Sequence, residues 1–304
     1  MATRAVSTQW QRAATTLIDR AARLTASSTD ARPERLYHFT DCAGLIGIFE
    51  NKTLWASLAT SLNDPSEVSY GLDLACELFR QRTITAQNFS LDGVDTLVGT
   101  RAAESRAYII SFCENLNLAG QWLHYGRSGS GVAVGFYPEH LTQAPYSLFR
   151  IVYHREHQIE AIRTIVRTID ESLNEFLPTI EDESQRDRLK KIAADVLADY
   201  LWMASPKLKH PSFAAEQEWR LIAYELRGPG EPHGEGPAGK THFRSSAGRV
   251  VPYKKLTFGM LPAFEVVLGS SCPMGPEDLG VFVLMEEKLG ARLTVRESDV
   301  PVRA

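Results

Sequence analysis

The segment 216–220 holds the residue types best suited to catalysis. It reads Glu-Gln-Glu-Trp-Arg. If Glu218 begins a β-strand, then Glu218 and Arg220 share one face of that strand and Trp219 takes the other. Glu216 then lies in the loop just before the strand. A carboxylate at this place can polarise a sugar hydroxyl and stabilise an oxocarbenium-like transition state. The structural alternative is an ion pair of half-buried Glu218 with Arg220 or another arginine.

A second candidate is the aromatic run at 36–40, which includes Tyr37, His38 and Thr40. Strand alternation places His38 and Thr40 on one face. An imidazole and a hydroxyl together offer a donor and an acceptor to a polar ligand such as a ribose or an amide. A strand end with a hydrogen-bonded histidine explains the same four letters, and it is the more common case.

The segment 61–67 packs turn-forming and polar residues closely together. Asn63 or Asp64 can cap a following helix, and Glu67 can reach back as the partner in a capping box. This structural role is sufficient. A role in ligand binding requires in addition that these side chains face a pocket.

Two rings and a histidine precede a glycine-rich stretch at 126–131. Trp122 or Tyr125 could stack on a base or a nicotinamide ring, although such rings more often belong to the core. The stretch itself could form an anion-binding nest, but a hairpin turn is the commoner explanation.

Other known chemistries leave no signature. The sequence has no Walker A loop, no G-x-S-x-G, no H-E-x-x-H and no G-x-G-x-x-G. His154 and His157 have a spacing that suits two metal ligands, but no third ligand with the usual spacing accompanies them. We therefore expect a solvated loop there and no metal site.

The elements that must position these residues follow from hydrophobic periodicity. Strands are expected at 36–40, 53–57, 107–113, 132–136, 147–153, 218–226, 250–258, 264–269 and 291–297. Helices are expected at 6–24, 45–51, 68–82, 278–289 and, as a hairpin divided by Pro178, at 158–204. The strands at 107–113 and 132–136 are expected to be neighbours.

Strands come in clusters with helices between them. This predicts an α+β fold with mixed, largely antiparallel sheets, flanking helices and an inserted αα-hairpin. We expect an N-terminal helix and linker over residues 1–33. The α+β domain should occupy 34–304, with the helical insert at 158–204.

Composition limits the class of protein. The chain has 304 residues, 44% of them hydrophobic, and a formal net charge of −4, which argues against general electrostatic binding to nucleic acid or membranes. Its four cysteines form no C-x-x-C pair, which favours a reducing compartment. The N-terminus lacks a secretory h-region, and no apolar stretch is long enough to span a bilayer. We expect a soluble, cytoplasmic protein.

Taken in order, several short motifs resemble the uncharacterised bacterial family DUF2971. They span about residues 34 to 300. The motifs lie at 36–40, 54–57, 62–67, 110–113, 121–126, 131–136, 209–213, 216–220 and 251–253.

The order of the strands is more distantly similar to the ADP-ribosyltransferase fold. By that resemblance, His38 contacts the adenosine-side ribose of NAD, with Thr40 beside it, and Glu218 contacts the nicotinamide ribose as the catalytic carboxylate. Glu216 corresponds to the position that helps to select the acceptor, and Ser111 lies on the middle strand. The chain departs from the best-known pattern because it lacks a clear Ser-Thr-Ser strand.

The resemblance implies an NAD-dependent ADP-ribosyltransferase that modifies a protein or nucleic-acid acceptor, in a defence or toxin-like role. The candidate catalytic residues are Glu218, Glu216 and Arg220. The candidates for binding NAD or a related nucleotide are Tyr37, His38, Thr40, Asn63, Asp64, Glu67, Ser111, Trp122 and Tyr125. The alternatives are an NAD glycohydrolase, another nucleotide-directed enzyme, or a non-catalytic sensor or binding module of phage defence.

Overall fold

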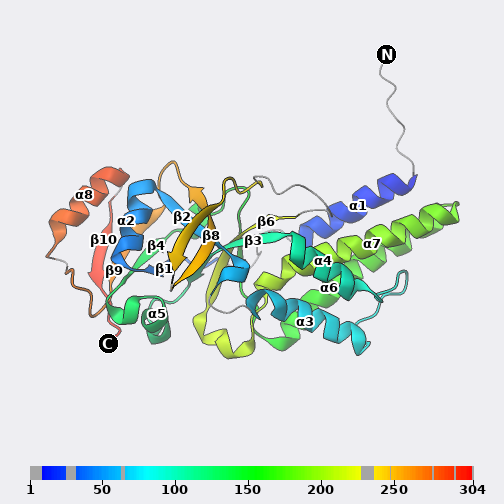
Figure 1. The fold of residues 1–304 in the computed structure, drawn as a ribbon, viewed down its shortest axis with the longest axis horizontal. Coiled ribbons are helices and arrows are strands. Elements are labelled where there is room, and N and C mark those ends of the chain that lie inside the picture. The colour runs from blue at the N-terminus through cyan, green and yellow to red at the C-terminus, as the bar shows by residue number, and fades with distance from the viewer. Residues whose placement is uncertain are drawn as a thin grey trace, which may run out of the picture.

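The computed structural model describes residues 9–24, 32–62, 66–226, 236–246, 248–275, 277–290 and 292–302. The molecule is elongated, with a twisted sheet towards one end and a bundle of long helices towards the other (Figure 1). The mixed α+β architecture is as expected. None of the helices within these ranges is both long and apolar enough to cross a membrane.

One large sheet holds the strands together. Its strands are β1 (Leu36–Thr40), β2 (Thr53–Leu58), β3 (Arg106–Cys113), β4 (Val132–Phe136), β5 (Ser147–Arg150), β6 (Glu218–Glu225), β7 (His242–Ser246), β8 (Arg249–Thr257), β9 (Ala263–Leu268) and β10 (Thr294–Glu297). Their order is β10-β9-β4-β1-β3-β2-β8-β7, with β6 paired to β3 and β5 paired to β6. The β9–β10 pair is parallel and the other named pairs are antiparallel, which confirms the predicted antiparallel character.

Strand β3 is the branch point of the sheet. Along one edge it pairs with β6 over its whole length, from Arg106 to Cys113. Along the other edge it pairs with β1 at Cys113 and with β2 at Tyr108 and Ile109. Strands β1 and β2 therefore separate beside residues 110–112, and we call this separation the fork.

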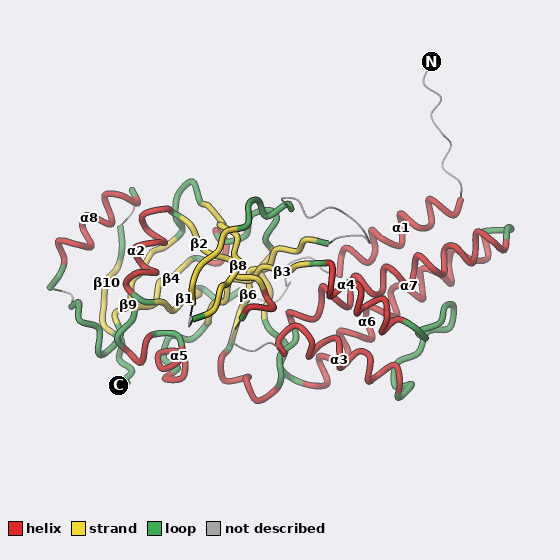
Figure 2. Tube along the Cα trace, viewed as in Figure 1, coloured by secondary structure: helices red, strands yellow, loops and turns green. Residues whose placement is uncertain are grey.

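Helices lie towards both ends of the molecule (Figure 2), and they pack on both faces of the sheet. They are α1 (Gln9–Leu24), α2 (Cys42–Asn51), α3 (Ser66–Arg80), α4 (Val94–Glu104), α5 (Ala119–His124), α6 (Arg155–Phe176), α7 (Glu183–Ala204) and α8 (Leu279–Leu289). The predicted insert at 158–204 is present as α6 and α7. Helices α1, α3, α4, α6 and α7 share one core with Ile109 and Ile222. Helices α2 and α8 share a second core with Ile110 and Leu221 on the opposite face.

Several sequence-based expectations were wrong. Strands β3 and β4 are not neighbours, because β1 lies between them. Their connection is long enough to carry α5 and to pass over β1, whereas neighbouring antiparallel strands need only a short turn. The stretch 126–131 is accordingly a 3₁₀ turn around Arg127–Gly129 rather than a hairpin turn. Strand β5 ends at Arg150, before the expected limit of 153.

Candidate functional site

The start of β6 carries a buried ion-pair network. Arg220 donates through Nε to Glu218 Oε1 at 2.7 Å and through Nη2 to Oε2 at 2.9 Å. Lys209 Nζ lies 3.2 Å from the same Oε2. All three side chains are buried: Glu218 is 7% exposed, Arg220 is 1% exposed and Lys209 is 4% exposed. Strand alternation thus brings Glu218 and Arg220 together as expected, and a chain segment nine residues earlier supplies a second cation.

Glu216 lies at the open edge of this network. Its carboxylate forms a close ion pair with Lys209, and its side chain is 22% exposed. It ends the 3₁₀ helix η6 (Pro211–Glu216), after which Gln217 takes a left-handed conformation with φ 47° and turns the chain into β6. The Glu216 carbonyl accepts hydrogen bonds from Cys113 Sγ at 3.1 Å and Gln121 Nε2 at 3.3 Å. The backbone of Glu216 is therefore fixed while its carboxylate stays within reach of solvent.

The network keeps Glu218 ionised. Burial alone would raise the pKa of this carboxyl. The charges of Arg220 and Lys209 and a hydrogen bond from the Ser111 side chain outweigh burial and lower the pKa of Glu218 to about 2. Its oxygens already accept bonds from these three side chains. Glu218 has little capacity left to accept a bond from a ligand hydroxyl.

His38 occupies the fork. Its Nδ1 lies 2.9 Å from the carbonyl oxygen of Ser111, in the stretch where neither β1 nor β2 pairs with β3. A carbonyl can only accept, so Nδ1 carries the proton. Burial lowers the pKa of His38, the Ser111 carbonyl opposes that change, and the positive charge of Arg244 adds to it. The ring is therefore a neutral imidazole at neutral pH, with Nε2 as an acceptor.

The strand register separates His38 from Glu218. Tyr37 is opposite Cys113, and Cys113 is opposite Glu218, so these three residues share one face of the sheet. His38 belongs to the other face, where its ring packs edge-on against Phe112 at 5.9 Å between centroids. Ser111 links the two faces, since its carbonyl meets His38 and its side chain meets Glu218. The two side chains therefore leave the sheet on opposite faces.

Other residues predicted to bind NAD have structural partners. Trp122 is completely buried, packs edge-on against Phe39 and donates from Nε1 to the Leu116 carbonyl at 2.9 Å, so it has no free ring face for stacking. Tyr37 is buried and hydrogen-bonded to Arg35 and Glu265. These two positions do not fit a ligand-binding role, because tertiary packing has used the groups that a ligand would need.

The remaining predicted residues are distributed over several places. Thr40 is partly buried, and its hydroxyl lies against Gly44 at the start of α2. Tyr125 is 40% exposed at the C-terminal end of α5. Asn63, Asp64 and the side chain of Glu67 lie outside the described residues.

The structure adds a group of residues that were not predicted as site residues, although three of them lie in the motifs at 54–57 and 251–253. The pairing of β2 with β3 and of β8 with β2 and β7 puts five side chains on the same face of the sheet as Ser111 and Glu218. They are Trp55, Ser57, His242, Arg244 and Tyr253. We call this face from β7 to β6 the polar row. It covers four spacings between adjacent strands, roughly 19 Å at about 4.8 Å each.

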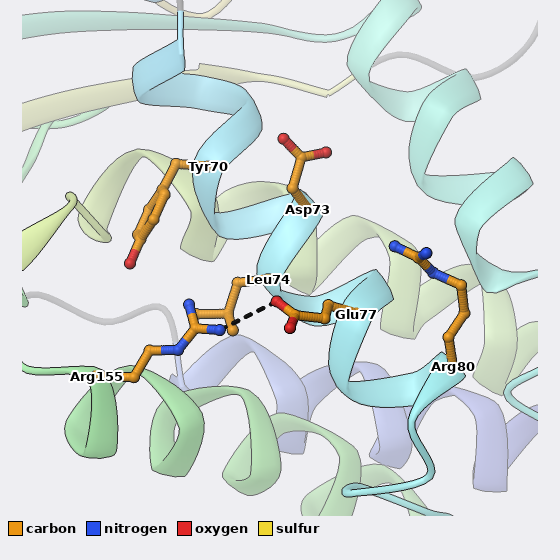
Figure 3. Close-up of a pocket in the computed structure, with 6 residues that line it drawn as sticks. All are labelled: Tyr70, Asp73, Leu74, Glu77, Arg80 and Arg155. Carbon is orange, nitrogen blue, oxygen red and sulfur yellow. Dashed lines mark hydrogen bonds and ion pairs between the residues drawn. The ribbon is translucent and has the colours of Figure 1, made fainter.

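Two surface hollows lie on the helical side of the molecule. One, of about 410 Å³, is lined by Tyr70, Asp73, Leu74, Glu77 and Arg80 of α3 and by Arg155 of α6, which pairs with Glu77 at 3.1 Å (Figure 3). The other, of about 390 Å³, is lined by residues 154–157. Neither hollow includes a residue of the fork or of the polar row.

His154 and His157 do not lie in a loop. His154 is the N-cap of α6 and His157 is in its first turn, with their ring centroids 5.5 Å apart. Within the described ranges, no group of three His, Cys, Asp or Glu side chains is arranged to hold a metal ion.

A family model matches part of the chain. No curated protein matches the chain, and no solved structure matches it. The matched family model covers residues 121–221, about a third of the chain, from α5 to the middle of β6. This segment contains the whole Lys209–Glu216–Glu218–Arg220 network but none of β1, β2, β7 or β8. Over residues 121–221 the chain is similar to DUF2971, a family described as proteins of unknown function.

Proposed function

We propose that the chain is an enzyme that transfers ADP-ribose from NAD to a macromolecular acceptor, with Glu216 as the carboxylate that meets the ribose. The observation that carries the proposal is the pair of unequal carboxylates at the start of β6. Glu218 is buried with its oxygens bonded, while Glu216, two residues earlier, is held by one of the same cations and remains accessible. The resemblance to ADP-ribosyltransferases gives the catalytic role to Glu218, and we move this role to Glu216 because the oxygens of Glu218 are already bonded.

The buried pair has a positioning role in this proposal. Arg220 and Glu218 form an ion pair and neutralise each other. Lys209 forms ion pairs with both Glu218 and Glu216, so it connects the two carboxylates. Because Lys209 is almost fully buried, its ammonium is held in place by packing as well as by charge. The Glu216 carboxylate is thus fixed at the sheet edge, as a preorganised catalytic group requires.

The proposed reaction breaks the bond between ribose C1′ and the nicotinamide nitrogen, and the electron pair leaves with neutral nicotinamide. Glu216 stabilises the positive charge that develops on the ribose. A nucleophile of the acceptor forms the new bond to C1′ and loses its proton to Glu216 or to water. When water takes the place of the acceptor, the same steps give free ADP-ribose, which is the glycohydrolase alternative.

Nicotinamide release from NAD tests the proposal. We expect Glu216→Gln to reduce the rate about 100-fold or more, the usual effect of removing an electrostatic catalytic group, in a protein that thermal melting shows to be folded. Glu181→Gln, in an exposed position, is the matched control and should keep the full rate. Absence of nicotinamide release from NAD in the unmodified protein would refute the proposal, whether or not NAD binds in calorimetry.

A non-catalytic binding module is the second candidate. It is favoured by the bonding of the Glu218 oxygens to Arg220, Lys209 and Ser111. It predicts that a nucleotide binds without turnover and that Glu216→Gln changes only the affinity. Product analysis separates the two candidates, because only an enzyme releases nicotinamide.

A further inference from the structure

Arg244 is partly buried, and no described carboxylate neutralises its charge. Its Nη2 donates to Ser57 Oγ at 2.9 Å, and its Nε is buried and has no hydrogen-bond partner in the described part of the chain. No described carboxylate forms an ion pair with it. A desolvated guanidinium without an anion is unfavourable, and an anionic ligand would offset that cost.

Aromatic rings surround this guanidinium. It lies 5.9 Å from the ring centroid of Trp55, and Trp55 stacks on Tyr253 with centroids 4.5 Å apart. Tyr253 also packs against His242 at 5.4 Å. Tyr253 is buried, but Trp55 keeps 36% of its surface exposed. A flat apolar group can therefore pack on Trp55 beside the guanidinium.

The surrounding charge is positive. Burial lowers the pKa of His242, and the positive charges of Lys255, Lys240 and Lys254 lower it further. Lys254 is neutralised by Glu225 at 2.9 Å, on the opposite face of the sheet. Lys255 shares the face of Trp55 by register. An aromatic surface with an unpaired arginine and further cations is suited to a ligand that combines a flat ring with phosphate.

We propose that Arg244, with Trp55 beside it, forms a subsite for the adenosine diphosphate part of a nucleotide, in which the free guanidinium nitrogens bind phosphate and Trp55 packs on the base. The identity of the whole ligand as NAD rests on the proposed function, but the recognition of a nucleoside diphosphate does not. The subsite lies at the β7 end of the polar row and Glu216 lies beyond its β6 end, so one extended dinucleotide would place its two halves at the two sites.

Calorimetric titration with ADP and with pyrophosphate tests the subsite directly. We expect Arg244→Met to weaken binding of both probes about 10- to 100-fold, the effect of losing a charged hydrogen bond, and Arg244→Lys to weaken it less. Trp55→Ala should weaken ADP alone. Arg12→Met, at an exposed arginine on α1, is the matched control and should change neither. Thermal melting identifies any variant that fails to fold, and Arg244→Lys then supplies the measurement.

The outcomes separate the two proposals. ADP binding that depends on Arg244 in a protein that releases no nicotinamide supports the subsite and refutes the proposed function. Nicotinamide release with the same KM in the unmodified protein and in Arg244→Met refutes the subsite and leaves the function standing. ADP binding that is absent, or equal in the unmodified protein, Arg244→Met and Arg244→Lys, also overturns the subsite.

Discussion

Replacing Glu218 by glutamine should destabilise the protein strongly. The change keeps the size of the side chain but removes the charge that neutralises Arg220 and Lys209, which are 1% and 4% exposed. Breaking a buried ion pair by removing one partner typically costs about 3–5 kcal/mol. The pKa of Glu218 gives an independent figure: about 2 in place of 4.5 corresponds to about 3 kcal/mol at pH 7. Against a total stability of about 5–15 kcal/mol, the loss is large.

The stabilisation by Glu218 should decrease as the pH falls. A carboxyl whose pKa is lowered by folding stabilises the folded state fully above its ordinary pKa and loses that contribution as the pH falls. For Glu218 the loss runs from about pH 4.5 down to about pH 2. Urea unfolding curves at several pH values should therefore show a difference between the unmodified protein and Glu218→Gln that is constant at neutral pH and narrows below pH 4.5. A difference smaller than about 1 kcal/mol at pH 7 would refute the reasoning, and Glu181→Gln controls for the chemistry of the substitution.

Three further changes have definite expected results. Tyr70→Phe removes the 2.9 Å hydrogen bond from Tyr70 Oη to Gln158 Oε1. Because Gln158 is fully buried, urea unfolding should show that the free energy of unfolding falls by about 1–3 kcal/mol. The control Tyr137→Phe, at an exposed ring, should leave it unchanged. Gly131→Ala would put its Cβ 2.4 Å from the Thr40 carbonyl oxygen and should lower stability by about 1–3 kcal/mol, whereas Gly47→Ala meets open space in α2 and should raise it by up to about 1 kcal/mol. Burial raises the pKa of the Cys113 thiol to about 12. Iodoacetamide at pH 8 should therefore modify Cys113 only after urea is added, as mass spectrometry would show. Alkylation of Cys113 in the native protein would contradict its burial as an unreactive thiol.

The sequence predicted what depends on local periodicity. The two-residue alternation at the start of β6 was enough to put Glu218 and Arg220 on one face and to raise the ion pair as the structural alternative. The same reasoning located α6, α7 and most strands, since their apolar patterns are long and regular. Lys209 was not predicted as a partner, because it reaches Glu218 only through the turn of η6.

The missed elements share a physical cause. Strand β7 is an edge strand that reads His-Phe-Arg-Ser-Ser, and an edge strand with one solvated face need not show an apolar pattern. Helix α4 begins at a left-handed Gly93 without a side-chain cap, so the usual start signal is missing. Arg244 was not predicted as a site residue, because its strand β7 was not predicted either. The neighbours of Arg244 follow from the pairing of β7 with β8, which puts His242 opposite Tyr253.

The separation of His38 from Glu218 shows why a site cannot be assembled from motifs alone. A shift of one residue in strand pairing moves a side chain to the other face of a sheet, and the sequence contains no information on the pairing of β1 with β3. The observed pairing of Tyr37 with Cys113 turns His38 towards Phe112 and leaves the Glu218 face to residues from β2, β7 and β8. The fork keeps the two faces coupled, because the bond from His38 to the Ser111 carbonyl fixes the residue whose side chain holds Glu218. A ligand on the polar row would therefore be recognised by residues of β2, β7 and β8, while His38 supports this part of the sheet from the opposite face.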